Sequence, residues 1–219
     1  MVDLITGLRA QDVRANLDRV REQIEGAGRN PNEVEILAAV KYLPVAQLQS
    51  LLDGGITVVG ENRAQELQQK AEAYPDAFTW DFIGQLQSRK VKQILPYVRY
   101  IHSVASDSAL KQLERHATSD TQVLVEVNVA REAGKSGIDP DELGDFIERC
   151  PVEVVGLMTM PPLAQDPEES RPHFVALARL ADRHGLRHLS MGTSQDYLVA
   201  VQEGATIVRL GTTLYQRAS

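Results

Sequence analysis

Residues 35–60, EILAAVKYLPVAQLQSLLDGGITVVG, contain one complete copy of the pattern that decides the fold. The β-type run Glu35–Val40 is followed by a helical stretch, Val45–Asp53, and then by a second β-type run, Ile56–Gly60. In the helical stretch the apolar residues fall at three- and four-residue spacing, which gives a helix one apolar face with which to cover a sheet. A strand, a helix and a further strand in this order predict a parallel βαβ unit.

The same alternation continues along the chain. The other β-type runs are Thr79–Gly84, Val98–His102, Thr121–Asn128, Val152–Met158, His188–Gly192 and Ala205–Leu210, and the helical stretches between runs include Arg63–Ala73, Ser108–Thr118 and Pro167–Arg183. Eight strands favour a closed barrel over an open doubly wound sheet, and 219 residues lie near the lower size limit of such a barrel. We therefore predict an α/β fold, a parallel eight-stranded (β/α)8 TIM barrel. It forms a single domain over residues 1–219, with an extra N-terminal helix at Leu8–Ala27.

Composition excludes several classes of protein. The net charge of -7 argues against general binding to nucleic acid or to an anionic membrane, since both need a basic face. Cys150 is the single cysteine, which excludes an intramolecular disulfide and fits a reducing compartment. The first 28 residues are charged and amphipathic, unlike a signal peptide or a membrane span. We expect a cytoplasmic monomer that binds neither nucleic acid nor membrane.

Lys41 follows the first predicted strand directly. In a barrel of this kind the active residues lie at the carboxyl ends of the strands, so Lys41 is expected at the mouth. Partial desolvation there would favour a neutral amine able to attack an aldehyde. The alternative is an ordinary solvated lysine at a strand end.

Two turns near the end of the chain are candidates for binding phosphate. The seventh predicted strand runs into residues 191–194 (MGTS), and the eighth runs into residues 209–212 (RLGT). Barrels frequently bind phosphate in the loops that follow these two strands. Gly192 and Gly211 allow close approach of backbone N–H groups, while Ser194 and Thr212 offer hydroxyl groups. The same residue types are also typical of ordinary turns.

Two other patterns do not support a site. Residues 134–136 (GKS) look like the tail of a phosphate-binding P-loop, but Val129 stands where the leading glycine is required and Pro140 interrupts the helix. His184 and His188 have the spacing of a helical zinc pair, but a glycine and a strand start break the shared helix. We predict no metal site.

A family resemblance rests on eight motifs that lie in order between Leu8 and Tyr215. The motifs are AVK (39–41), GENRAQE (60–66), FIGQLQ (82–87), IHSV (101–104), VN (127–128) followed by Glu132, Lys135 and Gly137, GLMT (156–159), LSMG (189–192) and VRLG (208–211). Together they resemble the pyridoxal phosphate homeostasis proteins, which are single-domain relatives of the alanine racemase barrel. The resemblance implies pyridoxal 5′-phosphate (PLP) as cofactor.

The resemblance also implies a role for six residues. Lys41 would form the Schiff base, Arg209 would face the pyridine nitrogen, Asn62 would lie beside the ring, and Ser194, Gly211 and Thr212 would hold the phosphate. This chain departs from the family pattern at four positions. Asp81 stands where the family usually has the histidine of a WHFIG motif, Arg89 where it has asparagine, Thr193 where it has methionine, and Gln216 where it has glycine.

Arg209 and the end of the chain bear on whether the protein is an enzyme. A carboxylate partner keeps the pyridine nitrogen protonated and makes PLP a strong electron sink, whereas an arginine can only donate to an unprotonated nitrogen. The chain ends seven residues after Thr212, which leaves no room for the second domain of alanine racemases. We expect a protein that holds PLP on Lys41 and releases it to acceptors such as apo forms of PLP enzymes, without a dedicated catalytic activity.

Two alternatives remain open. A weak PLP-dependent amino-acid racemase would need a second proton donor near the open face, for which Asp81, Tyr42 and Tyr215 are candidates. A barrel enzyme that acts on a phosphorylated metabolite could instead use Lys41 as an aldolase-type amine.

Overall fold

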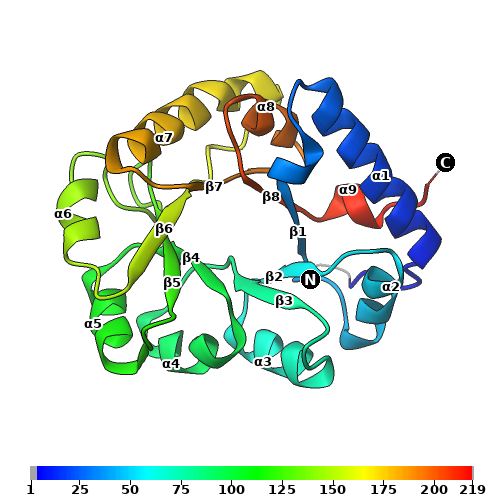
Figure 1. The fold of residues 1–219 in the computed structure, drawn as a ribbon, viewed down its shortest axis with the longest axis horizontal. Helices are drawn as coiled ribbons and strands as arrows, with labels where there is room; N and C mark the ends of the chain where they lie inside the picture. The colour runs from blue at the N-terminus through cyan, green and yellow to red at the C-terminus, as the bar shows by residue number, and fades with distance from the viewer. Residues whose placement is uncertain (1–3, 219) are drawn as a thin grey trace.

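The computed structural model describes residues 4–218. Within them, eight parallel strands close into a barrel in chain order, and β8 pairs with β1. The strands are β1 (Glu35–Ala39), β2 (Val58–Glu61), β3 (Thr79–Phe82), β4 (Tyr100–Val104), β5 (Gln122–Glu126), β6 (Glu153–Met158), β7 (His188–Thr193) and β8 (Ile207–Leu210). They form an inner ring that helices surround (Figure 1). The predicted parallel (β/α)8 barrel is confirmed.

The helices alternate with the strands around the outside. The α-helices are α1 (Ala10–Gly26), α2 (Leu48–Asp53), α3 (Ala64–Ala73), α4 (Val91–Ile94), α5 (Asp107–His116), α6 (Leu143–Glu148), α7 (Arg171–His184), α8 (Tyr197–Gln202) and α9 (Thr212–Tyr215). Short 3-10 helices are η1 (Pro31–Glu33), η2 (Val45–Gln47), η3 (Ser88–Lys90), η4 (Leu95–Tyr97) and η5 (Pro167–Ser170). The predicted extra N-terminal helix is confirmed as α1.

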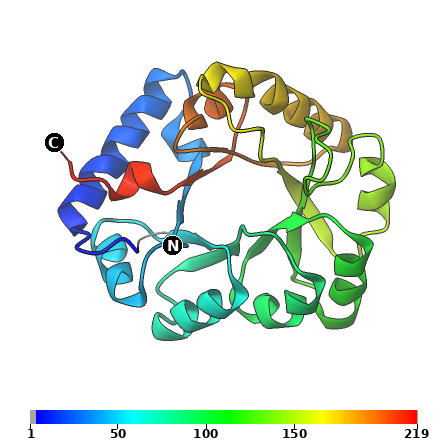
Figure 2. The same ribbon diagram turned by 180° about the vertical axis from the view of Figure 1, so that it is seen from behind.

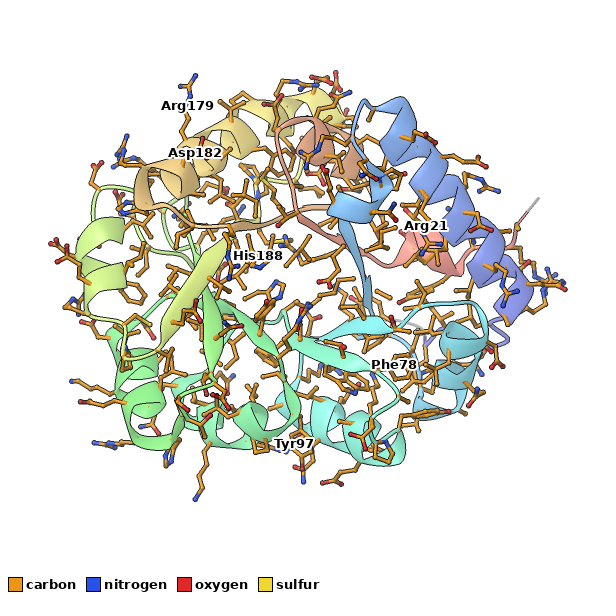
Figure 3. The ribbon with its side chains drawn as sticks, in the orientation of Figure 1. Arg21, Phe78, Tyr97, Arg179, Asp182 and His188 are labelled. Carbon is orange, nitrogen blue, oxygen red and sulfur yellow. The ribbon has the colours of Figure 1, made fainter. Side chains whose placement is uncertain are left out.

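Most of the apolar core lies between the strands and the helices. On α7, Phe174 and Leu177 are fully buried three residues apart, as expected for a helix with one face on a sheet. Figure 3 shows Arg179 of the same helix projecting outward, whereas His188, at the start of β7, lies at the ring of strands. The helix ends at Gly185, which takes the left-handed conformation that commonly terminates helices.

The extra helix α1 holds the end of the chain in place. Figures 1 and 2 both show α1 and α9 side by side, although they lie at opposite ends of the sequence. The buried Asn16 side chain of α1 donates to the carbonyl oxygens of Leu214 at 3.2 Å and Gln216 at 2.7 Å. Because α9 directly follows the turn after β8, α1 helps to position that turn.

The ends of the predicted domain, residues 1–3 and 219, lie outside the described residues. Among residues 4–218, no helix is both long enough and apolar enough to span a membrane.

Candidate functional site

The six residues predicted from the sequence lie at the ends of four neighbouring strands. Lys41 follows β1, Asn62 follows β2, Ser194 follows β7, and Arg209, Gly211 and Thr212 lie at the end of β8 and just after it. The register between β1 and β8 pairs Ala38 with Leu210. The structure therefore brings the segments that carry these residues to one part of the barrel mouth.

The backbone before Lys41 is fixed by a distant side chain. The Tyr215 hydroxyl donates to the carbonyl oxygen of Ala39 at 3.1 Å. Lys41 itself is half-buried, and its Nζ lies 4.8 Å from the centre of the Tyr42 ring. Its amine therefore sits at the rim on a backbone that is held in place.

A buried ion pair holds the same backbone from the other side. The ammonium group of Lys70, in α3, lies 2.5 Å from Glu61 Oε2 and donates to the carbonyl oxygen of Val40 at 2.8 Å. The side chains of Glu61 and Lys70 are 0% and 3% exposed. Glu61 Oε1 also accepts the backbone N–H of Asn62 at 2.6 Å. One ion pair thus ties together the segments that carry Lys41 and Asn62.

Arg209 uses four of its five N–H groups within the protein. Nη1 donates to the carbonyl oxygen and the hydroxyl of Ser190, at 2.7 and 2.6 Å. Nη2 donates to the carbonyl oxygen of Thr159 and to the sulfur of Met160, both at 2.9 Å. Among residues 4–218, no hydrogen bond uses Nε. This N–H is available to a ligand.

Arg209 is a buried cation. Burial lowers the pKa of Arg209 to about 10, and the negative charges of Asp196 and Glu126 oppose that shift. The side chain is therefore protonated at neutral pH and can only donate hydrogen bonds.

Backbone N–H groups converge on one hydroxyl after β8. Ser194 Oγ accepts the N–H of Gly211 at 3.2 Å and that of Thr213 at 3.3 Å, while Thr212 is exposed. A Cβ built on Gly211 would meet no atom closer than 3.9 Å, so the space above this backbone is open. Gly192 differs, because a Cβ there would lie 2.6 Å from the Ala200 Cβ. Gly211 thus has room for a ligand, whereas Gly192 packs tightly against α8.

A cavity of about 820 Å³ opens beside these residues. It is lined by the ends of β3 to β7, with Glu126, Met160 and Leu163 among its residues. Of the six predicted residues, Asn62 lines this cavity, whereas Ser194 lines a neighbouring one of about 460 Å³. The buried Oδ1 of Asn62 has no hydrogen-bond partner among the described residues. A buried acceptor without a partner is costly unless a ligand supplies one.

The structure corrects the expected position of Asp81, which the sequence placed near the mouth. Its side chain is fully buried inside the barrel and pairs with Arg99 at 2.7 Å and with His102 at 3.1 Å. Arg99 immediately precedes β4 and also pairs with Glu35, the first residue of β1. Asp81 therefore faces the amino-terminal ends of the strands and is no candidate for a proton donor at the mouth.

Several residues of the site were missed by the sequence analysis. Ser190 contacts Arg209 and His102, whereas Lys70 contacts Glu61 and the carbonyl oxygen of Val40, and none of the three stands out by spacing. The available signal was the family motifs, because Glu61 lies within GENRAQE, His102 within IHSV and Ser190 within LSMG, whereas Lys70 lies in none of them. No cluster of three or more His, Cys, Asp or Glu side chains that could hold a metal ion is found in residues 4–218.

Comparison with known proteins agrees with this geometry. Residues 8–218 match the family model of the alanine racemase N-terminal domain, so the chain belongs to that class of barrel. A pyridoxal phosphate homeostasis protein of Aquifex aeolicus is 40% identical over 213 residues, which cover 91% of this chain and 93% of that protein. Within the class, the chain therefore belongs to the pyridoxal phosphate homeostasis protein family, as the sequence motifs predicted.

Solved structures extend the comparison. PipY of Synechococcus elongatus, solved with PLP bound, has a TM-score of 0.78 and 30% identity, and the match covers 93% of this chain and 100% of PipY. Alanine racemase of Corynebacterium glutamicum has a TM-score of 0.72 at 16% identity, and this chain covers 63% of it. The second likeness shows a shared fold.

Proposed function

We propose that this protein binds PLP as a Schiff base on Lys41 and acts in PLP homeostasis, holding the cofactor and releasing it to acceptors. The observation that carries the proposal is the pairing of Ala38 with Leu210, which puts the segments of Lys41 and Arg209 side by side on the rim. The name of the Aquifex relative and the PLP-bound structure of PipY support it.

Ser194, Gly211 and Thr212 are the residues proposed to hold the phosphate. The N–H groups of Gly211 and Thr213 already converge on one oxygen, Ser194 Oγ. The open space above Gly211 leaves room for a further oxygen atom. Backbone N–H groups and hydroxyls are good donors to a phosphate, so this turn fits the anionic end of the cofactor.

Arg209 and Asn62 are the residues proposed to flank the ring. PLP supplies an electron-withdrawing pyridine ring and a reactive aldehyde. Arg209 has an N–H to offer through Nε and no proton to give up, so it would keep the ring nitrogen unprotonated. The unpartnered oxygen of Asn62 marks a polar group that still needs a ligand. An unprotonated ring is a weak electron sink, which favours holding the cofactor over catalysis.

The cavity beside the site supports release. It lies next to Asn62 and is large enough for a second molecule beside a cofactor anchored on Lys41. Because a Schiff base is reversible, an incoming amine can take the place of the Lys41 amine. The proposed recipients are apo forms of PLP enzymes, and the protein is proposed to act as a cytoplasmic monomer, which sedimentation velocity would check.

An absorbance titration with PLP tests the anchor. We expect the wild-type protein to develop an imine band that Lys41→Ala abolishes. Lys135→Ala is the matched control, because Lys135 is an exposed lysine that lines the cavity, and its band should be unchanged. A normal band in Lys41→Ala would overturn the assignment. Absence of PLP binding by the wild type would favour an enzyme that acts on a phosphorylated metabolite.

A weak amino-acid racemase is the second candidate function. The observation that favours it is the position of Tyr42 beside Lys41. Its ring contacts the Lys41 amine, which places a phenol next to the anchor. Tyr215 is less suited, because burial raises the pKa of its phenol and its hydroxyl is bound to the Ala39 carbonyl. Solvent deuterium incorporated at the α-carbon of amino acids, and lost in Lys41→Ala and Tyr42→Phe, would support this activity.

A further inference from the structure

A line of polar side chains crosses the inside of the barrel from the site to the opposite end. From the site downward, its members are Arg209 in β8, Ser190 in β7, His102 in β4, Asp81 in β3, and then Arg99 and Glu35. Ser190, His102 and Asp81 are 0% exposed. Barrel interiors are usually filled by branched apolar side chains, so a continuous polar line inside one calls for a physical reason.

The upper part of the line joins Arg209 to Asp81 through two residues. Arg209 Nη1 donates to Ser190 Oγ at 2.6 Å, and the same oxygen lies 2.8 Å from His102 Nδ1. The other ring nitrogen, Nε2, lies 3.1 Å from Asp81 Oδ2. All three distances lie within or near the usual range for hydrogen bonds.

Asp81 is the last residue of this upper part, and its carboxyl group is ionised. Burial alone would raise the pKa of its carboxyl, but the hydrogen bond from His102 and the hydrogen bonds and charge of Arg99 hold that pKa below its ordinary value. Arg99 donates to both carboxylate oxygens of Asp81, at 3.1 and 2.7 Å, and also to Glu35. An ionised carboxylate can only accept hydrogen bonds.

The charge of Asp81 sets the direction of each bond above it. Because Asp81 can only accept, His102 Nε2 must carry a hydrogen, and in the neutral ring Nδ1 is then an acceptor. The Ser190 hydroxyl donates to Nδ1 and keeps a lone pair for Arg209. With a doubly protonated ring, the Ser190 hydrogen would have no acceptor among residues 4–218. The neutral ring is therefore the form that satisfies every partner.

We propose that Asp81 acts through His102 and Ser190 as a positioning residue, which orients Arg209 so that its Nε–H faces the ring nitrogen of bound PLP. This inference rests on the proposed function. Ser190 takes both hydrogens of Nη1 through its carbonyl and its hydroxyl, so rotation of the guanidinium would break both bonds. Asp81 stands where the resembled family usually has histidine, so the arrangement is a property of this chain.

The first test needs no cofactor. Nitrogen NMR of protein labelled in histidine should show His102 as the neutral tautomer with the hydrogen on Nε2, and His102→Gln identifies its signal. In Asp81→Asn the preference for this tautomer should be lost. A wild-type His102 that carries its hydrogen on Nδ1, or that is unchanged by Asp81→Asn, would contradict the proposal.

The second test compares PLP with a deaza analogue in which C–H replaces the ring nitrogen. The analogue should bind the wild type about tenfold or more weakly, the ratio expected from one lost hydrogen bond to a charged group. Asp81→Asn should weaken PLP binding by about tenfold and leave the affinity for the analogue unchanged. The ratio of the two affinities should then fall to about one. Equal weakening of both ligands would show a structural role only.

The controls separate the possible failures. Asp12→Asn is the matched variant, because Asp12 is a buried aspartate that pairs with Arg9 on α1, outside the line, and the ratio should stay at its wild-type value. Should Asp81→Asn not fold, Ser190→Ala should also collapse the ratio, and Ser190→Thr, which keeps the hydroxyl, should restore it. A wild type that binds both ligands equally would overturn the inference, whereas a wild type with no imine band would overturn the proposed function itself.

Discussion

On one side of the barrel mouth, the ends of β8 and β1 are tied down by buried charges. On the other side, the ends of β3 to β7 surround a cavity of about 820 Å³. The anchor side comprises Lys41, Ser194, Arg209 and Gly211, and buried side chains such as Lys70 bind the backbone next to its residues. The open side includes the loop of residues 160–165, where Met160 is 51% and Leu163 is 85% exposed.

This difference fits the proposed function, in which the protein both holds PLP and releases it. A covalent anchor needs a fixed backbone, and the hydrogen bonds to the carbonyl oxygens of Ala39 and Val40 provide it. An exchanging amine needs room to approach, and a cavity of this size provides that. We therefore expect stability to depend on the anchor side and to tolerate change on the open side.

The largest expected effect is on the buried ion pair. Glu61→Ala removes the carboxylate nearest the buried Lys70 ammonium and leaves only Glu66 Oε2, at 3.4 Å and on a partly exposed side chain. We expect a loss of about 3–5 kcal/mol in the free energy of unfolding, measured by urea denaturation. Glu61→Leu combined with Lys70→Met should recover most of that loss, because no unpaired charge then remains. A single variant as stable as the wild type would show that the pair does not hold the anchor side.

Two glycines, Gly192 in β7 and Gly211 just after β8, differ in the space above their backbone. Gly192 has φ +90°, and a Cβ there would lie 2.6 Å from the Ala200 Cβ, so Gly192→Ala should cost about 1–3 kcal/mol of stability. Gly211 has φ -123° and open space above it, so Gly211→Ala should change stability by less than about 0.5 kcal/mol. Thermal unfolding measures both. Gly211→Ala should nevertheless weaken PLP binding, since its methyl group would occupy the proposed phosphate position.

A pH-dependent prediction concerns Glu126 on the open side. Burial raises the pKa of its carboxyl, while the Ser136 hydroxyl and the charge of Arg209 oppose the shift. Between the ordinary carboxyl pKa and the raised one, the folded chain binds more protons than the unfolded chain, so stability falls as pH rises through that window. Glu126→Gln should therefore become more stable relative to the wild type as pH rises through it.

Thermal unfolding of both proteins across this pH range measures the difference. Glu153→Gln, a change at an exposed carboxyl at the far end of β6, is measured alongside as the surface control. A Glu126→Gln variant that becomes less stable relative to the wild type as pH rises through this window would contradict the sign.

The smallest effect is expected at Leu163. Its side chain is 85% exposed on the open side, so Leu163→Ser should change the free energy of unfolding by less than about 0.5 kcal/mol. Urea denaturation measures it. A loss above 1 kcal/mol would place this loop among the structural elements and remove the contrast between the two sides.

The barrel was predictable because its strands are short, apolar and regularly separated by amphipathic stretches. The boundaries of the strands were less predictable. The fourth strand was predicted at Val98–His102 and is Tyr100–Val104, because the 3-10 helix Leu95–Tyr97 extends the preceding segment. Helices such as α9, with four residues, are too short for an apolar period to be visible.

The site was predictable where it depends on position along a strand. Lys41 and Arg209 reach the mouth because they lie at the ends of β1 and β8. Lys70 was not predictable, because lysine is rarely buried and its partner Glu61 lies nine residues away. Asp81 was misplaced because alternation along a strand gives the face of a residue, whereas its depth depends on how the strands are staggered.

Borohydride reduction of the PLP-loaded protein, followed by mass spectrometry of its peptides, identifies the lysine that carries PLP. Reduction converts the Schiff base into a stable secondary amine, so the modified peptide shows which lysine carried PLP. We predict a label on the peptide that contains Lys41 and none on those of Lys70 or Lys135. A label on Lys135, or one spread over exposed lysines with Lys41 unmodified, would show that Lys41 does not anchor PLP.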